Sequence, residues 1–395
     1  MRTDQDVGYI ASSSLVGSRL NSQLRDSPAS ISVMTAEFLA DLGATDMEDA
    51  LLYANNIQKN VSDEVSGVAN GNSAVEFFTN YRVRGIKANT ARNYYAWNLP
   101  TDLYNVDRVD QARGPNAILF GIGSAGGIIN TTTKTARLTR DAYEAGVVFS
   151  SHDSRRGSID VNKVLRRDVL AFRLNAVYDD SSTFRFFESS KKQLFDSTVT
   201  WKPFAQTTVR GQWEKGVVDQ VRTRPWGLVD LVSTWERAGK PVTATLAANA
   251  TLGIGRLAAA TPRVTYIEQA DKLYDLRGAI FTTVAAALSN RMDLTAPSSV
   301  NPEGPGAVNT TDIMNYTLSA DQQIGRNTFV QLSFNHQEYD WIGYDSNNGE
   351  AHNFSADPGA NLLTAANPYA GRYYIDTNWY RRNRRESFDT LRVTA

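Results

Sequence analysis

After about residue 137 the chain alternates apolar and polar positions with a period of two. In the segment 170–178, one face carries Leu170, Phe172, Leu174, Ala176 and Tyr178, and the other face includes Arg173 and Asn175. The same alternation occurs near 143–150, 158–165, 193–202, 207–214, 313–324, 328–337 and 386–395. Such a pattern is typical of half-buried strands. It predicts about eight strands of roughly 8–12 residues each, which matches the ~9–11 residues of a tilted membrane-spanning strand.

The connections between these strands alternate in length. Tight turns are predicted at 165–168, 202–206 and 325–327, whereas long connections are predicted at 179–192, 215–312 and 342–385. Apart from the short first link at 151–157, long and short connections alternate, as in outer-membrane barrels. The pattern therefore predicts a transmembrane antiparallel β-barrel. A soluble β-sandwich or propeller also shows alternation and stays open as an alternative, although no repeat of 40–50 residues is found.

The first part of the chain carries mixed signals. Thr45-Asp46-Met47-Glu48 has the form of a capping box before a short helix, and Thr35 is a candidate cap for another. The segments 31–33, 81–84 and 106–111 read as strands. We therefore expect an N-terminal extension at 1–19, a small α+β domain at 20–136 and strands of a barrel at 137–395.

Composition excludes several classes of function. The 395 residues include 41 Lys+Arg and 42 Asp+Glu, so the net charge of −1 gives no electrostatic case for nucleic-acid binding. No cysteine is present, which excludes disulfides, thiolate zinc sites and cysteine catalysis. The three histidines, His152, His336 and His352, lack the spacing of a metal pair. We expect no enzyme, because no nucleophile–base pair or metal cluster is evident.

Hydropathy is low throughout. No run of 18 apolar residues is present, so the sequence predicts no transmembrane helix, and the N-terminus shows no apolar core of a signal peptide. A mean hydropathy of −0.37 is expected for strands with one polar face.

A glycine-rich run, Gly121-Ile122-Gly123-Ser124-Ala125-Gly126, has the G-x-G-x-x-G spacing of dinucleotide sites. Such sites need a helix after the glycines, but Gly127 to Thr133 is a β-branched run that favours a strand. We therefore interpret the run as a tight turn between two strands.

The same region resembles a known family. The segment 113–121, Arg-Gly-Pro-Asn-Ala-Ile-Leu-Phe-Gly, with Gly126-Gly127-Ile128-Ile129-Asn130 and Thr133-Lys134, is similar to the plug-domain signature of TonB-dependent outer-membrane receptors. Supporting matches are Val106-Asp107-Arg108-Val109-Asp110, Arg84-Gly85, the segment 26–35 and Leu51-Leu52-Tyr53. The resemblance covers about residues 15–136 and is nearest to the siderophore-receptor branch.

This resemblance implies a fold and a function. The family has a twenty-two-stranded barrel with the plug folded inside it, and ligand binds on the outer side. The TonB–ExbB–ExbD complex then remodels the plug, so we expect active import through the bacterial outer membrane, in contact with its lipid. The implied ligand is a small molecule such as a ferric siderophore, which would carry Fe³⁺, and no cofactor is expected. Alternatives are import of a saccharide or another nutrient, a passive porin or surface-binding barrel, and a soluble β-rich enzyme.

The resemblance also implies roles for residues. The plug motif comprises Arg84, Gly85, Arg113, Gly114, Pro115, Gly121, Gly126, Gly127, Asn130 and Lys134. Arg84 and Arg113 are expected to be buried and to pair with barrel glutamates, with solvated surface arginines as the alternative. The candidates for ligand contact are Tyr94, Tyr95, Trp97, Phe186, Tyr373 and Trp379, which could instead belong to an aromatic girdle or to loop packing.

Two features depart from the family pattern. No segment before Leu15 resembles the family's TonB box. About eight strands are too few, because an eight-stranded barrel is just filled by its own side chains and cannot enclose a plug of more than about 100 residues. The sequence therefore predicts a fragment, consisting of the plug and the first third of the barrel. Unpaired sheet edges lead us to expect aggregation of the isolated chain.

Overall fold

A computed structural model describes most of the chain. The longer described stretches are 30–59, 81–114, 124–221, 304–325, 328–346 and 379–394. Shorter pieces are described at 8–11, 13–14, 22–24, 229–230, 239, 254–256, 264–267, 272–275, 281–283, 299, 301, 353–356, 361–362, 365–366 and 372–376. Within these residues, no helix combines the length and the apolar character that crossing a membrane requires.

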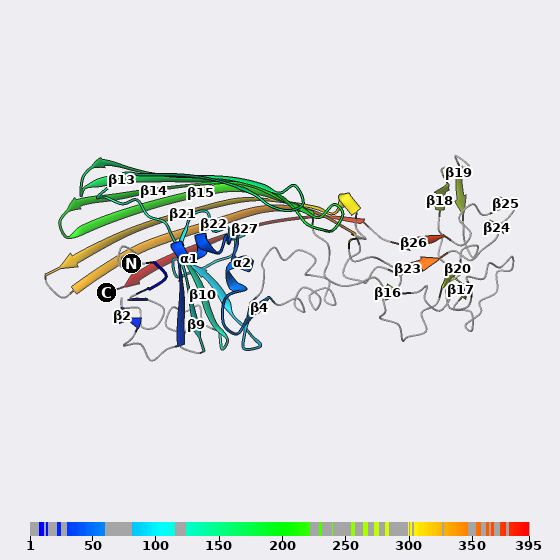
Figure 1. Cartoon of the computed structure of the whole chain (residues 1–395), viewed down its shortest axis with the longest axis horizontal. Helices are drawn as coiled ribbons and strands as arrows, with labels where there is room; N and C mark the ends of the chain where they lie inside the picture. The colour runs from blue at the N-terminus through cyan, green and yellow to red at the C-terminus, as the bar shows by residue number, and fades with distance from the viewer. Residues whose placement is uncertain are drawn as a thin grey trace.

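One large antiparallel sheet dominates the molecule (Figure 1). Its eight strands follow one another in chain order, each paired with the next: β11 (Ala142–Phe149), β12 (Arg155–Arg166), β13 (Leu170–Ser182), β14 (Ser189–Phe204), β15 (Thr207–Val221), β21 (Val308–Ile324), β22 (Thr328–Ser346) and β27 (Trp379–Thr394). The alternating pattern thus predicted all eight. Among the described strands, β11 and β27 have no second partner in this sheet, which is a curved wall open at both edges.

Most strands are longer than predicted, with β22 reaching 19 residues. The expected long connection at 179–192 is wrong, because β13 and β14 continue their pairing from Asp179↔Lys192 to Ser182↔Ser189 and leave only residues 183–188 between them. Both faces are polar in this stretch, so apolar alternation stops before the hydrogen-bonded ladder does. The sheet therefore extends beyond its apolar band.

The two ends of the sheet differ as expected. The connections 167–169, 205–206 and 325–327 lie at one end, which we term the turn end. The opposite end, termed the loop end, carries the connections 150–154 and 183–188 and the long segments after β15 and β22 (Figure 1). This asymmetry matches membrane barrels, in which short turns lie on the periplasmic side and long loops outside.

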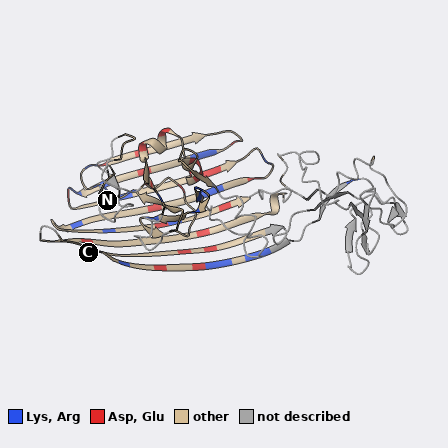
Figure 2. Cartoon of the chain, turned by 90° about the horizontal axis from the view of Figure 1, so that it is seen from below, with Lys and Arg blue, Asp and Glu red and all other residues tan. Residues whose placement is uncertain are grey.

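The faces of the wall have opposite character. The convex face exposes apolar side chains such as Val147, Val199, Trp201, Leu318 and Leu332. The inward face carries buried polar side chains, including Asn162, Asp196, Glu214, Asn315, Asn335 and Gln337. Figure 2 shows acidic and basic positions on the strands over which the N-terminal part of the chain lies. The polar positions of the alternating pattern are thus buried because an N-terminal domain covers them.

The N-terminal domain contains two small sheets. The larger has the order β3-β9-β10-β7-β8, formed by β3 (Ser30–Thr35), β9 (Val106–Arg113), β10 (Gly127–Thr133), β7 (Asn89–Arg92) and β8 (Tyr95–Ala96). The smaller has the order β4-β5-β6, formed by β4 (Ile57–Lys59), β5 (Tyr81–Val83) and β6 (Ile86–Lys87). Helices α1 (Ala36–Asp41) and α2 (Met47–Leu51) pack beside them. Met34, Leu39, Leu51, Val109 and Ile129 belong to the shared core.

The observed helix caps lie at, or one residue from, the positions that the sequence predicts. Thr35 caps α1, since its hydroxyl accepts the amide of Phe38 at 3.3 Å. Helix α2 is capped by Asp46 rather than by Thr45, because the Asp46 carboxylate accepts the amide of Asp49 at 3.0 Å. Thr45 instead donates its hydroxyl to Asp49 at 3.1 Å.

The remaining described elements are short. They are β1 (Ser13–Ser14), β2 (Ser22–Gln23), β16 (Val229–Asp230), β17 (Ile254–Arg256), β18 (Val264–Ile267), β19 (Lys272–Asp275), β20 (Phe281–Thr283), a 3₁₀ turn at Gly304–Gly306, β23 (Asn353–Ala356), β24 (Asn361–Leu362), β25 (Ala365–Ala366) and β26 (Tyr373–Asp376). Most of these strands belong to the segments after β15 and β22, at the loop end (Figure 1).

The turn before β10 depends on Gly127. Its φ of +117° is unfavourable for other residues, and an added Cβ would collide with the backbone oxygen of Ala112. We expect Gly127→Ala to destabilise the N-terminal domain by about 3 kcal/mol. Because the chain has no cysteine, an Ala50→Cys reporter in the buried core can be labelled with maleimide during urea unfolding of the full-length protein in detergent.

Gly43→Ala is the matched control for this change. Gly43 also has a positive φ, +66°, but nothing lies within 4 Å of an added Cβ. Only backbone strain of about 1 kcal/mol is expected there. Equal losses in the two variants would contradict the collision at Gly127.

Candidate functional site

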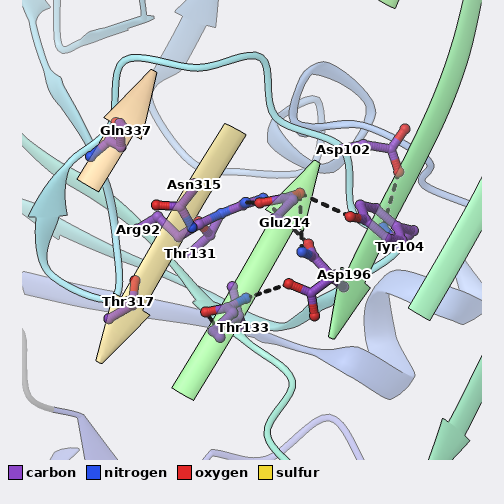
Figure 3. Close-up of polar contacts among 12 residues, drawn as sticks. Arg92, Asp102, Tyr104, Thr131, Thr133, Asp196, Glu214, Asn315, Thr317 and Gln337 are labelled. Atoms are coloured by element: carbon purple, nitrogen blue, oxygen red, sulfur yellow. Dashed lines mark hydrogen bonds and ion pairs between the residues drawn. The ribbon is translucent and has the colours of Figure 1, made fainter. Parts of the chain in front are cut away.

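The inward face of the wall binds the N-terminal domain through a buried ion pair (Figure 3). Arg92, at the end of β7, places Nη1 2.5 Å from Oε2 of Glu214 on β15, and both side chains are only 2% exposed. Tyr104 and Asn105 donate to the other carboxylate oxygen of Glu214, at 2.9 and 3.2 Å. Burial, and then the Glu214 carboxylate, raise the pKa of Tyr104 well above its ordinary value, so its hydroxyl remains a donor.

The Glu214 cluster continues along the wall. Gln212, two residues earlier on the same face of β15, accepts the hydroxyl of Thr133 at 3.1 Å. Its amide nitrogen donates to Asp196 on β14 at 2.7 Å. Gln212 thus links the N-terminal domain to both β14 and β15.

An apolar contact lies beside the ion pair. Trp97, Leu99 and Tyr104 pack against a barrel-wall set that comprises Val177, Leu194, Val218, Ile313, Tyr339 and Trp341. The guanidinium of Arg92 lies 4.0 Å from the centroid of the Trp97 ring. Gln337 of β22 clamps this segment, because it donates to the carbonyl of Ala96 at 2.8 Å and accepts the amide of Asn98 at 3.0 Å.

Asp102 forms a second polar cluster. Arg156 of β12 donates to both of its carboxylate oxygens, at 2.5 and 3.0 Å, and Lys192 of β14 donates at 3.1 Å. The amide of Tyr104 adds a fourth hydrogen bond at 3.0 Å. Burial acts to raise the pKa of Asp102, but Lys192 and Arg156 outweigh it and hold that pKa below its usual value. One carboxylate therefore joins the domain to two strands.

Lys134 forms the third cluster, at the exit of the N-terminal domain. Its ammonium donates to Asp160 of β12 at 2.9 Å and to the carbonyl of Tyr104 at 3.0 Å. Arg173 of β13 binds the same carboxylate in a bidentate manner, at 2.7 and 2.6 Å. Lys134, a member of the predicted plug motif, thus helps fix the junction between domain and wall.

The predicted arginines do not make the expected contacts. Arg84 is exposed and lies with Gly85 in a turn at φ of +52°, so the described part of the chain does not bury it, and its pairing with a barrel glutamate stays a prediction. The turn reverses the chain between β5 and β6 and directs the side chain away from the core. Arg113 is partly buried and donates to Ser30 and Ser32 at 3.2 and 2.8 Å rather than to a glutamate. The pairing of an arginine with a wall glutamate occurs instead at Arg92.

The other motif residues are structural where they are described. Asn130 is fully buried in β10 and accepts the amide of Tyr94 at 2.8 Å. Gly126 has backbone oxygens of Ile86 and Lys87 within 2.6 Å of the position of a Cβ. Gly114 adopts a positive φ of +87° at the end of β9. Pro115 and Gly121 lie outside the described residues.

The aromatic candidates occupy different environments. Tyr94, Tyr95 and Trp97 are buried at 7%, 2% and 5% exposure between the domain and the wall, rather than on an open apex. Phe186 is exposed in the connection 183–188 at the loop end. Tyr373 lies in β26 and Trp379 begins β27, but their side chains fall outside the described ones. Ligand contact by these residues stays a prediction.

Sequence reasoning missed Arg92, Asp102 and Glu214. The available signal was the alternation of β15, which places Glu214 on the same face as Gln212 and Arg210. A carboxylate on the inward face of a strand needs a partner. Among the described residues, no group of three or more His, Asp or Glu side chains could hold a metal ion.

Comparison with known proteins gives a consistent result. Residues 23–128 match the model of the TonB-dependent Receptor Plug Domain. The chain is 30% identical over 196 residues to the metal-pseudopaline receptor CntO of Pseudomonas aeruginosa, covering 49% of this chain and 27% of that protein. It is 29% identical over 199 residues to the ferripyoverdine receptor of the same species, covering 49% and 24%. The chain thus spans about a quarter of the length of these curated relatives.

Solved structures extend the likeness to the wall. The open form of the ferric-catecholate import receptor Fiu from Escherichia coli K12 matches with a TM-score of 0.64 at 13% identity, over 95% of this chain and 47% of that one. The ferric preacinetobactin receptor BauA from Acinetobacter baumannii matches with a TM-score of 0.60 at 15% identity, over 89% and 44%. At such identities the likeness establishes the fold: an N-terminal plug against part of a transmembrane antiparallel β-barrel.

Proposed function

We propose that this chain, which carries the plug domain and part of the barrel of a TonB-dependent receptor of the bacterial outer membrane, belongs to an active importer of a scarce ligand. The observation that carries the proposal is the mode of contact between plug and wall. Buried but polar bonds at Glu214, Asp102 and Asp160 hold the plug in place. Such bonds can be replaced by water when the plug moves, unlike a continuous apolar core.

The proposed direction of transport is supported by the two ends of the sheet. The turn end corresponds to the periplasmic side, and β2 (Ser22–Gln23), close to the start of the plug, lies toward that end (Figure 1). A TonB–ExbB–ExbD complex acting from the periplasm would therefore reach the N-terminal side of the plug. Ligand would bind at the loop end, where Phe186 and the segments after β15 and β22 lie.

A ferric siderophore is the proposed ligand. The support is the printed names of the relatives, which include receptors for metal-pseudopaline and ferripyoverdine. The iron would travel as part of the ligand, and the protein itself would need no cofactor. The residues proposed to contact it are Tyr94, Tyr95, Trp97, Phe186, Tyr373 and Trp379; the buried three would become accessible only when the plug shifts.

Uptake of a radiolabelled ferric siderophore by cells that express the full-length gene tests this function. We expect uptake that is lost after deletion of the gene and after collapse of the proton gradient by a protonophore. Uptake that persists with the protonophore would indicate a passive porin. Growth of the deletion strain that fails on a glycan but not under iron limitation would indicate a saccharide importer.

A further inference from the structure

The turn-end half of the contact between plug and wall contains a cavity of about 150 Å³, which we term the turn-end cavity. Its plug residues flank the turn between β7 and β8 and the end of β10, and its wall residues come from β14, β15, β21, β22 and β27. Arg210 and Gln212 of β15 line it, and both lie between the turn at 205–206 and Glu214. Because a water molecule takes up about 30 Å³ of liquid, the cavity accommodates a small polyatomic solute.

Two arginines line the turn-end cavity from a single row of the wall. Arg210 of β15 is paired with Ser319 of β21, Ser319 with Ser333 of β22, and Ser333 with Arg392 of β27. Three strand spacings separate the arginines, which places their backbones ~14 Å apart. Both side chains reach the cavity from opposite sides, with Ser319 between them. The row therefore directs two guanidiniums at one small space.

The groups around the turn-end cavity carry an excess of positive charge. Arg210 forms an ion pair with Oδ2 of Asp321, and Oδ1 of Asp321 accepts the amide of Gln331 at 2.7 Å. Within the described residues, Arg392 bonds only to neutral acceptors: two plug carbonyls at 3.3 Å and Oε1 of Gln331 at 3.4 Å. One carboxylate thus serves two guanidiniums, and this imbalance favours an anionic ligand.

Neighbouring charges on β14 do not reverse this balance. Lys202 lies on the inward face of β14, one step closer to the turn end than Thr200, which lines the cavity. No ion pair of Lys202 is found among the described residues, so it adds a positive charge on the turn-end side. Asp196 lies in the other direction, does not line the cavity and accepts the amide of Gln212 at 2.7 Å. A small anion approaching from the turn end therefore meets cations first.

Hydrogen-bond donors are available around the turn-end cavity. Thr132, Thr317 and Ser319 line it, and each hydroxyl can turn its proton toward an acceptor. Arg210 donates to the described part of the chain through Nη1 alone, so its Nε and Nη2 groups are available. Guanidiniums bind oxyanions through two parallel N–H groups. The lining thus offers both the charge and the donors that an oxyanion needs.

We propose that the turn-end cavity binds a small free oxyanion of the phosphate type. Arg210 and Arg392 bind its oxygens from two sides, and the Ser319 hydroxyl donates to it from the wall between them. Arg392 also holds the plug, because it bonds the two plug carbonyls and its guanidinium lies 4.3 Å from the centroid of the Tyr95 ring. The bound anion therefore joins plug to wall and stabilises the seated plug. A lipid phosphate cannot reach it, because the cavity lies on the inward face.

Inorganic phosphate tests the proposal on the full-length receptor, in a detergent without phosphate groups. Equilibrium dialysis with radiolabelled phosphate measures binding, and we expect phosphate to raise the urea concentration at which the Ala50→Cys reporter is labelled, relative to chloride at equal ionic strength. Arg392→Gln should weaken binding about tenfold, as loss of a charge-assisted bond would. Asp321→Asn should tighten binding about fivefold, because it removes the one negative charge beside the anion. A gain of this kind cannot come from misfolding.

Arg155→Gln is the matched control, because Arg155 also pairs with an aspartate, Asp180, but lies at the loop end and does not line the cavity. It should bind phosphate as the unchanged receptor does. A short-chain phosphatidylcholine should not displace the radiolabel, and displacement would assign the site to a lipid phosphate instead. The proposal is also overturned if the unchanged receptor binds no phosphate, or if Asp321→Asn binds it more weakly. Siderophore uptake is a separate measurement that none of these outcomes predicts.

Discussion

Replacing Glu214 with alanine is expected to loosen the plug from the barrel wall by about 3–5 kcal/mol, the usual cost of leaving a buried charge without its partner. Arg92 would keep its guanidinium in a site where it is 2% exposed. Tyr104 and Asn105 would lose the acceptor that they share. We expect the urea concentration at which the Ala50→Cys reporter becomes labelled in the full-length receptor to fall sharply.

Two control variants separate charge from packing. Glu214→Gln keeps the shape and one acceptor oxygen, so it should lose less stability than Glu214→Ala while still leaving Arg92 uncompensated. Lys215→Ala removes the adjacent residue, which is exposed on the convex face, and should leave plug labelling unchanged. If Glu214→Ala labels as Lys215→Ala does, the ion pair does not hold the plug.

The eight-stranded wall could be predicted because alternation is a local signal. In β13 the residues Leu170 to Tyr178 display it without any knowledge of neighbours. The ends of the strands could not, since Asp179 to Ser182 are polar on both faces and only their pairing with β14 makes them strand. The same limit explains the one-residue error at the cap of α2, where Thr45 and Asp46 are both good caps and the choice depends on tertiary contacts.

The plug–wall contacts could be predicted in kind but not in detail. The family resemblance implied that plug arginines pair with wall glutamates, and it pointed to Arg84 and Arg113. Arg92 and Glu214 are 122 residues apart, and their meeting depends on how the domain sits on the sheet. Periodicity assigns Glu214 to the inward face, but it carries no information about what lies opposite.

Replacing Asp102, which lies toward the loop end, is expected to destabilise the plug about as much as replacing Glu214 does. Asp102→Ala leaves Arg156 and Lys192, which are 10% and 14% exposed at the side chain, without their shared carboxylate. We expect the plug to lose about 3–5 kcal/mol of stability. We also expect proteoliposomes with the full-length variant to admit small sugars that the unchanged receptor excludes.

The pH dependence of plug stability tests whether the charge on Asp102 is what stabilises the plug. Its folded pKa is held below the ordinary value of 3.8. The stabilisation is therefore complete only above about pH 5, where the carboxylate is ionised whether the plug is folded or unfolded. As the pH falls further, the unfolded state takes up a proton before the folded state does. The stability of the plug therefore decreases until the pH lies below the pKa of Asp102 in the folded state. Urea unfolding between pH 6 and about pH 2 should show this loss in the unchanged receptor and a flatter profile in Asp102→Asn.

Asp141→Asn provides the comparison for this titration. Asp141 also has a lowered pKa, through its bond to Lys163, but both groups are largely accessible at the turn end. Water and salt screen such a pair, so its removal should leave the pH profile of plug labelling unchanged. A flattened profile in Asp141→Asn, with Asp102→Asn unaltered, would show that exposed carboxylates govern plug stability. If only Asp102→Asn flattens the pH profile of plug labelling, then one buried carboxylate, bonded to two strands of the wall, makes the stability of the plug depend on pH.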